Sequence, residues 1–147
     1  DIIAINLSSA FHTMRAAMPA MAARGYGRVV NIASVHGLVA SKDKAPYVAS
    51  KFGIVGLSKV AALEYAAQGS RDSGGITVNC VCPGPTDTPL MAAVPDKVKD
   101  ALIKAIPLRR LGKPEEVAEA VLFFAGPGAA YITGQVLSVS GGLTMAG

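Results

Sequence analysis

A tyrosine and a lysine four residues apart suggest a site that moves protons on and off an alcohol or ketone oxygen. Tyr47 and Lys51 follow Pro46 in a run predicted to be helical, and their spacing places both side chains on one helical face. A free phenol titrates near pH ~10 and is a poor base at neutral pH. Because a fixed cation beside a phenol favours its ionised form, the pair has the chemistry of a general acid–base catalyst.

A serine hydroxyl is expected opposite this pair. Ser34 ends an apolar run, 29–33, that the sequence predicts to be a buried strand. From the end of that strand Ser34 could hydrogen-bond the substrate oxygen that Tyr47 protonates. Proton transfer at an alcohol oxygen suits hydride transfer at the adjacent carbon, and the hydride would then go to a cofactor.

The elements that must position these residues alternate between helix and strand. Periodicity and breakers predict helices over 1–23, 46–67, 96–105 and 113–125, and strands over 29–33, 76–81 and 134–139. This alternation predicts an α/β fold, with a parallel sheet and helices on both faces. Gly53 and Gly56 each cost the second helix about 1 kcal/mol relative to alanine, which suggests close packing against another helix or a cofactor.

Several longer segments together resemble a known family. They are Asn6-Leu7, Asn31–Ser34, the Tyr47/Lys51 pair, Val78–Gly84, Ile132–Gln135 and Gly141-Gly142. In order and spacing, from the first residue to the last, they resemble the short-chain dehydrogenase/reductase family. The resemblance implies an enzyme that transfers a hydride between NAD or NADP and a secondary alcohol or ketone. The fold it implies is the C-terminal portion of a Rossmann-like, doubly wound parallel sheet, with three strands and flanking helices.

The resemblance also implies the catalytic roles. Ser34 would orient the substrate oxygen, and Tyr47 would be the acid/base. Lys51 would favour the ionised tyrosine, and with Tyr47 it would contact the cofactor, Lys51 holding the ribose. Asn6 would anchor a water in a proton relay.

A turn after the second strand is the further candidate cofactor-binding segment. It follows the carboxyl end of a strand, where open α/β sheets bind ligands. By resemblance, the backbone near Thr86 and the hydroxyl of Thr88 meet the nicotinamide carboxamide and a nearby phosphate, and Pro83 and Gly84 belong to the same turn. The alternative is an ordinary proline/glycine turn.

The family's glycine-rich phosphate loop is not found in the 147 residues, nor is the residue that selects between NAD and NADP. We therefore expect 1–147 to be the C-terminal part of one such domain, with the N-terminal cofactor-loop half absent, and to bind the cofactor weakly on its own. The alternative of another class is an inactive fragment that acts at most as an assembly module. By resemblance its helices 1–23 and 46–67 pack between subunits.

Two residues are candidates for holding a substrate carboxylate. His36 and Lys44 stand where bacterial 3-hydroxybutyrate dehydrogenases, by resemblance, hold that group; the alternative is a solvent-facing loop. The segments 82–90, 104–108 and 132–145 resemble 2-hydroxycyclohexanecarboxyl-CoA dehydrogenases instead. The expected substrate is thus a hydroxyacid, a hydroxyacyl-CoA or a cyclic alcohol, and 3-oxoacyl carrier-protein reductase activity is the alternative.

Residues 86–113 are predicted to form a lid over the substrate. They hold six basic and three acidic residues, a net charge of +3. A positive lid could favour an acyl-CoA or a carboxylate. A solvated amphipathic helix would have the same composition.

Composition excludes several other classes. The net charge is +4, but no run of Lys/Arg indicates nucleic-acid binding, and no apolar run is long enough for a membrane span. No secretory signal is visible. Cys80 and Cys82 face the same way on a strand and are too few ligands for zinc, and His12 and His36 follow no metal-ligand pattern. The expectations are a cytoplasmic protein with a small-molecule substrate, no metal and, by resemblance, a dimeric or tetrameric homo-oligomer.

Overall fold

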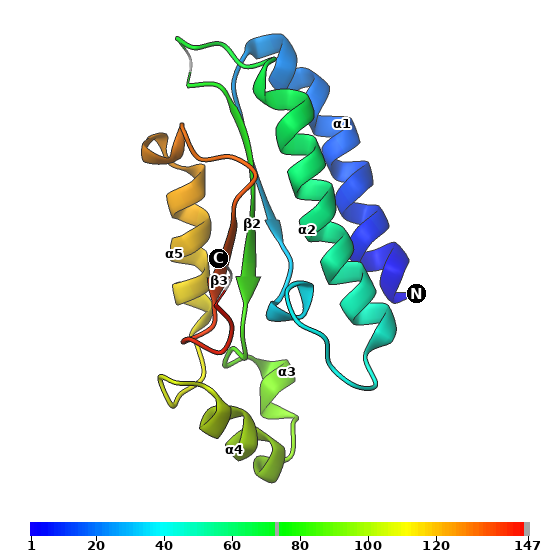
Figure 1. The fold of residues 1–147 in the computed structure, drawn as a ribbon, viewed down its shortest axis with the longest axis vertical. Helices are drawn as coiled ribbons and strands as arrows, with labels where there is room; N and C mark the ends of the chain where they lie inside the picture. The colour runs from blue at the N-terminus through cyan, green and yellow to red at the C-terminus, as the bar shows by residue number, and fades with distance from the viewer. Residues whose placement is uncertain (73, 146–147) are drawn as a thin grey trace.

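The computed structural model describes residues 1–72 and 74–145. A three-stranded parallel sheet in the order β1-β2-β3 lies between two helical layers (Figure 1). The strands are β1 (Gly27–Ile32), β2 (Ile76–Pro83) and β3 (Val136–Val139). Helices α1 (Ser9–Arg24) and α2 (Ala45–Ala66) cover one face of the sheet, and α5 (Pro114–Ala125) covers the other. The predicted α/β architecture is confirmed.

A small helical arm extends beyond the carboxyl end of β2 (Figure 1). It contains α3 (Pro89–Ala92) and α4 (Asp96–Ala105). The bounds of α4 match the predicted helix, but α3 was not predicted. Its signal is local: the Thr88 hydroxyl accepts a hydrogen bond of 3.2 Å from the amide of Met91, and Pro89 stands in the first turn.

Several boundaries differ from the prediction. The first helix extends to Arg24, but η1 (Ala4–Ser8) within it is wound as a π-helix. Strand β1 begins two residues earlier than expected, at Gly27, and ends at Ile32. The predicted loop after it contains the one-turn helix η2 (Val35–Gly37), and η3 (Pro127–Ala129) follows α5. Strand β3 begins at Val136 because Gly134 adopts a φ of +70°.

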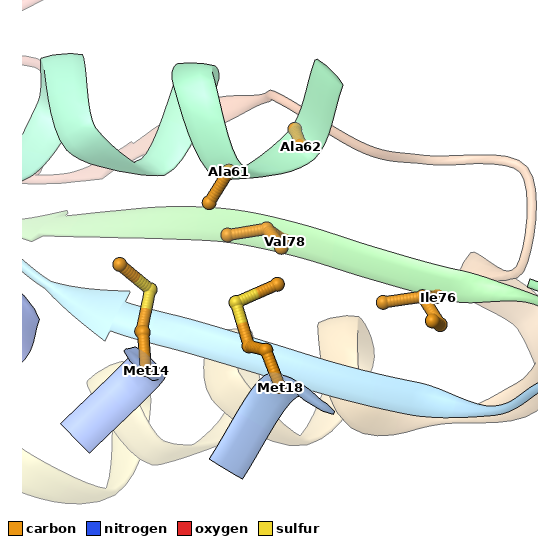
Figure 2. Packing of buried hydrophobic residues seen from close by; sticks show 6 residues of the cluster. All are labelled: Met14, Met18, Ala61, Ala62, Ile76 and Val78. Carbon is orange, nitrogen blue, oxygen red and sulfur yellow. The ribbon is translucent and has the colours of Figure 1, made fainter. Parts of the chain in front are cut away.

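One cluster of six buried side chains lies between the sheet and the α1–α2 layer. Figure 2 shows how the two thioethers reach from α1 toward β2 and the alanines of α2. The members are Met14, Met18, Ala61, Ala62, Ile76 and Val78. Residues of β2 are buried on both faces, because α5 packs against the opposite side of the sheet. This central strand therefore holds the site at its carboxyl end in a fixed place.

The two helix glycines behave differently. A Cβ on Gly53 would lie 2.6 Å from Leu7, so α2 packs closely against η1 there, as predicted. A Cβ on Gly56 would meet nothing within 4 Å. The prediction of close packing at Gly56 is wrong, because that side of α2 faces open space.

No helix in the described ranges, 1–72 and 74–145, combines the length and apolarity needed to cross a bilayer.

Candidate active site

One cavity gathers most of the predicted site residues at the carboxyl end of the strands. Its volume is about 450 Å³. All predicted residues except Asn6 and Lys51 line it: Ser34, His36, Lys44, Tyr47, Pro83, Gly84, Thr86 and Thr88. A larger cavity, of about 570 Å³, lies by the start of β2 and contains none of these residues, so size alone does not identify the site.

Ser34 stands where the chain leaves β1. The amide of the preceding Ala33 still bonds to the carbonyl of Val81 at 2.8 Å, which fixes this exit to β2. The Ser34 hydroxyl accepts a hydrogen bond of 3.1 Å from the amide of His36, and the side chain is buried. Because this bond uses the oxygen as acceptor, the hydroxyl proton remains available to a ligand in the cavity.

Tyr47 and Lys51 lie together on α2, as their spacing predicted. The Lys51 ammonium nitrogen is 5.6 Å from the centre of the Tyr47 ring and donates a 3.2 Å hydrogen bond to the carbonyl of Ile32. Burial lowers the pKa of Lys51, and the neighbouring Cys80 and Cys82 partly oppose that shift. The Lys51 ammonium therefore lies near the Tyr47 ring, between α2 and the end of β1.

Asn6 reaches the tyrosine through a residue that the sequence reasoning missed. Its side-chain amide donates a 3.1 Å hydrogen bond to the hydroxyl of Ser50, which donates in turn to the carbonyl of Tyr47 at 2.7 Å. Ser50 is completely buried. A small polar residue one turn after Tyr47, in an otherwise apolar helix face, is the signal that could have identified it.

The two candidate carboxylate ligands, His36 and Lys44, line the same cavity. The rings of His36 and Tyr47 meet edge to face, with centres 6.1 Å apart. Burial, followed by the charge of Lys44, lowers the pKa of His36, and the backbone of Val39 partly offsets this. The cavity therefore combines Lys44 with an imidazole whose pKa is lowered by burial and by that neighbouring charge.

The segment after β2 also lines the cavity. The Thr86 hydroxyl donates a 2.9 Å hydrogen bond to the carbonyl of Gly84. A Cβ on Gly84 would lie 2.9 Å from Ser140, so only glycine allows this turn to pack against the loop after β3. Apolar side chains from the arm line the cavity as well, and sequence reasoning missed them: Leu90, Met91 and Val94.

This cavity has the side chains needed for proton transfer to a ligand oxygen. The hydroxyl-bearing Ser34 and Tyr47 line it together with residues of the Pro83–Thr88 turn. A volume of about 450 Å³ lies within the range of small-ligand sites.

The sequences to which this chain is similar are named as dehydrogenases or reductases. Residues 1–144 match the family model described as enoyl-(acyl carrier protein) reductase. The chain is 45% identical over 155 residues to D-beta-hydroxybutyrate dehydrogenase of Rhizobium meliloti (strain 1021), covering 97% of the chain and 58% of the relative. It is 42% identical over 145 residues to 3-oxoacyl-[acyl-carrier-protein] reductase of Escherichia coli (strain K12), covering 99% and 57%.

The similar solved structures are also named as dehydrogenases. A crystal structure assigned to a gluconate dehydrogenase of Agrobacterium tumefaciens has a TM-score of 0.88 and 34% identity, covering 96% of this chain and 55% of that one. A second, assigned to a 2-deoxy-D-gluconate 3-dehydrogenase of the same organism with bound NADP, has a TM-score of 0.86 and 34% identity, covering 94% and 55%. The chain spans between 55% and 58% of the length of these four proteins.

Proposed function

Because this chain belongs to the short-chain dehydrogenase/reductase family, we propose that it transfers a hydride between NAD or NADP and a secondary alcohol or ketone. The observation that carries the proposal is the cavity that Ser34 and Tyr47 line together with residues of the Pro83–Thr88 turn. In this proposal both hydroxyl groups bind one ligand oxygen. The Lys51 ammonium nitrogen lies 5.6 Å from the Tyr47 ring centre, so the two side chains act at the same end of the cavity-lining helix.

Each side chain has a separate task in this proposal. In this proposal the Tyr47 hydroxyl gives its proton to the ketone oxygen in reduction, and the Tyr47 phenolate takes the proton from the alcohol in oxidation. Ser34 donates a hydrogen bond to the same oxygen, and the His36 amide holds the serine in place. Asn6, tied to α2 through Ser50, anchors a water that passes protons to and from the site.

The residues of the cavity fit the nicotinamide end of the cofactor. When bound, NAD or NADP supplies the hydride acceptor or donor. Pro83, Gly84, Thr86 and Thr88 would hold the nicotinamide end, and Lys51 would hold the ribose. We assign 1–147 to the C-terminal part of a single Rossmann-like domain, because the glycine-rich loop that binds the pyrophosphate is not in this sequence.

The substrate that the cavity favours is a small hydroxyacid. His36 and Lys44 lie where they could hold its carboxylate, and a relative named D-beta-hydroxybutyrate dehydrogenase is 45% identical. A 3-oxoacyl thioester is the second candidate. The apolar wall of Leu90, Met91 and Val94 and the positive lid, 86–113, would suit an acyl chain and its acidic carrier.

Exposed apolar side chains and the two cysteines support the proposals of a homo-oligomer and of a cytoplasmic location. Large apolar side chains are exposed on α1 and α2, among them Phe11, Phe52 and Leu63, which supports a homo-oligomer assembled through these helices. Cys80 and Cys82 are free and buried, as expected in the reducing cytoplasm.

The test uses the full-length protein and two tyrosine variants. We expect NADH or NADPH binding by nicotinamide fluorescence, and turnover of D-3-hydroxybutyrate. Removing the acid–base group with Tyr47→Phe should lower kcat by about 10²- to 10⁴-fold without abolishing cofactor binding. Tyr131→Phe changes an exposed tyrosine and is the control. Turnover unaffected by Tyr47→Phe would refute the mechanism, and a stable protein that binds neither cofactor would favour an assembly module.

A further inference from the structure

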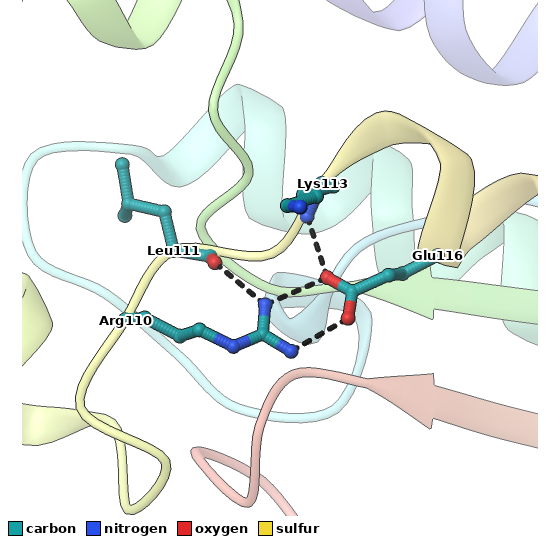
Figure 3. Close-up of polar contacts among 4 residues, drawn as sticks. All are labelled: Arg110, Leu111, Lys113 and Glu116. Carbon is teal, nitrogen blue, oxygen red and sulfur yellow. Dashed lines mark hydrogen bonds and ion pairs between the residues drawn. The ribbon is translucent and has the colours of Figure 1, made fainter.

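A bidentate ion pair closes the segment between α4 and α5. The Arg110 guanidinium donates to both carboxylate oxygens of Glu116, at 2.8 and 2.6 Å, and to the carbonyl of Leu111 at 3.1 Å. The same carboxylate accepts a 2.7 Å hydrogen bond from the amide of Lys113 (Figure 3). Residues 110–116 therefore form a closed turn with the carboxylate of Glu116 at its centre.

The residue enclosed by this turn is bonded to the proposed cofactor segment. The amide of Gly112 donates to the carbonyl of Pro85 at 3.0 Å, and the amide of Asp87 donates to the carbonyl of Gly112 at 2.8 Å. Thr86, which stands between Pro85 and Asp87 in the chain, forms a parallel β-bridge with Gly112. A shift of Gly112 would thus displace the backbone on both sides of Thr86.

The ion pair lies directly against this bridge. A Cβ built on Gly112 would be 3.9 Å from the Glu116 carboxylate and 3.9 Å from the Thr86 hydroxyl. Its side chains remain partly exposed, at 50% and 39%, and exposed ion pairs add little to folding stability. A fork-to-fork arginine–carboxylate contact does, however, fix geometry strongly. We therefore expect this ion pair to fix the position of the backbone around Gly112 rather than to raise the free energy of unfolding.

We propose that Arg110 and Glu116 are positioning residues that hold Thr86 in place for binding the nicotinamide end of the cofactor. The inference rests on the proposed function of the Pro83–Thr88 turn. It assigns a role in the site to two side chains that lie outside the catalytic residues. Arg110 acts through Glu116 and Gly112.

The alternative role is to stabilise the start of α5, and two variants separate it from positioning. Arg110→Gln removes the guanidinium but keeps the bond from the Lys113 amide to Glu116, so the helix cap stays intact. Glu116→Gln keeps a possible acceptor for that amide and removes the charge. Glu115→Gln is the matched control, because it removes a carboxylate from the same first turn without touching Arg110.

The experiment measures two quantities in the full-length protein. Amide hydrogen exchange at Asp87 and Gly112 tests whether the bridge loosens, with the amide of Cys80 in β2 as an internal reference. Nicotinamide fluorescence and steady-state kinetics test the site. We expect Arg110→Gln and Glu116→Gln to speed exchange at both amides and to weaken cofactor binding by about three- to tenfold. In both variants kcat should stay within about twofold, because the acid–base residues are untouched.

The results distinguish positioning of Thr86 from stabilisation of the start of α5. Faster exchange with weaker cofactor binding in both variants, and neither change in Glu115→Gln, supports positioning. Unchanged exchange or unchanged cofactor affinity in Arg110→Gln would overturn it, as would equal effects in the control. A wild-type protein that binds no cofactor would refute the proposed function as well, and that result is visible before any variant is compared.

Discussion

The side-chain amide of Asn6 donates a hydrogen bond of 3.1 Å to the hydroxyl of Ser50. This contact joins the π-wound segment η1 to the buried face of α2, one turn after Tyr47. π-helical turns are frequent at functional sites, and the contact lies within such a turn. It presents Asn6 to the helix that carries the proposed acid–base residue.

Removing this hydroxyl tests the link directly. Ser50→Ala leaves the Asn6 amide without its acceptor, so the free energy of unfolding should fall by about 1–3 kcal/mol. The turnover number should fall about tenfold or more, because Asn6 and Tyr47 lose their mutual alignment. Chemical denaturation and steady-state kinetics on the same samples measure both effects.

The same helix offers a matched control. Ser58 is also buried, accepts a 2.9 Å bond from the Asn31 amide and donates to the carbonyl of Ile54 at 2.7 Å. Ser58→Ala should cost similar stability but leave turnover nearly unchanged. Equal losses of turnover in the two variants would rule out a special role for Ser50.

The pH dependence of substrate binding should depend on His36. Its pKa lies below the ordinary value of 6.5, mainly through burial and then through the charge of Lys44. A carboxylate bound beside the imidazole stabilises the protonated form and raises that pKa. Affinity for a hydroxyacid is therefore highest below the pKa of the free protein and declines as pH rises through the pKa of the complex.

The measurement is the KM for D-3-hydroxybutyrate between about pH 5 and 8, the range in which histidines titrate. KM should rise with pH in the wild type, and the curve should flatten over this interval in His36→Gln. An identical curve in the variant would show that the carboxylate does not contact this imidazole.

Glu116 should make a small contribution to resistance against acid, because solvent screens a partly exposed ion pair. The hydrogen bonds from Arg110, followed by the one from the Lys113 amide, lower the pKa of this carboxyl from 4.5 to about 2. Because the folded protein holds this group ionised more strongly than the unfolded chain does, its stabilisation is present above pH 4.5. It is lost progressively as pH falls toward about 2. Urea midpoints across this range should depend less on pH in Glu116→Gln, whereas Glu115→Gln should keep the wild-type slope.

The core between α1 and β2 should be sensitive to truncation at Met18. This side chain is 2% exposed and packs in the cluster of Figure 2. Met18→Ala should lower the free energy of unfolding by about 2–5 kcal/mol, through lost burial and a residual cavity. Met145→Ala alters a methionine that is 87% exposed and should change stability by less than about 0.5 kcal/mol. Equal denaturant midpoints for the two variants would contradict this account.

Much of this molecule could be predicted because its chemistry is local in sequence. The Tyr47–Lys51 spacing fixes a shared helical face, and the turn after β2 must lie at the carboxyl end of a parallel sheet. The bounds of α2 and α4 followed from apolar periodicity and breakers. These features depend on a few consecutive residues, which is why the pattern was sufficient.

The features that sequence reasoning missed depend on contacts distant in the chain. The role of Ser50 depends on Asn6, which is 44 positions away. The bridge between Thr86 and Gly112 joins two loops with no periodicity. The open space at Gly56 and the close approach at Gly53 are set by where η1 lies, and one helical sequence is compatible with either arrangement.

The burial of both thiols in the central strand has a practical consequence. Cys80 and Cys82 are fully shielded from solvent, so an alkylating reagent can reach them only when the layers around β2 separate. The labelling rate of the native protein therefore measures how often such openings occur, and it needs no engineered residue because both thiols are natural. A ligand that binds at the end of β2 would be detected because it slows alkylation of Cys80 and Cys82, whatever reaction the ligand undergoes.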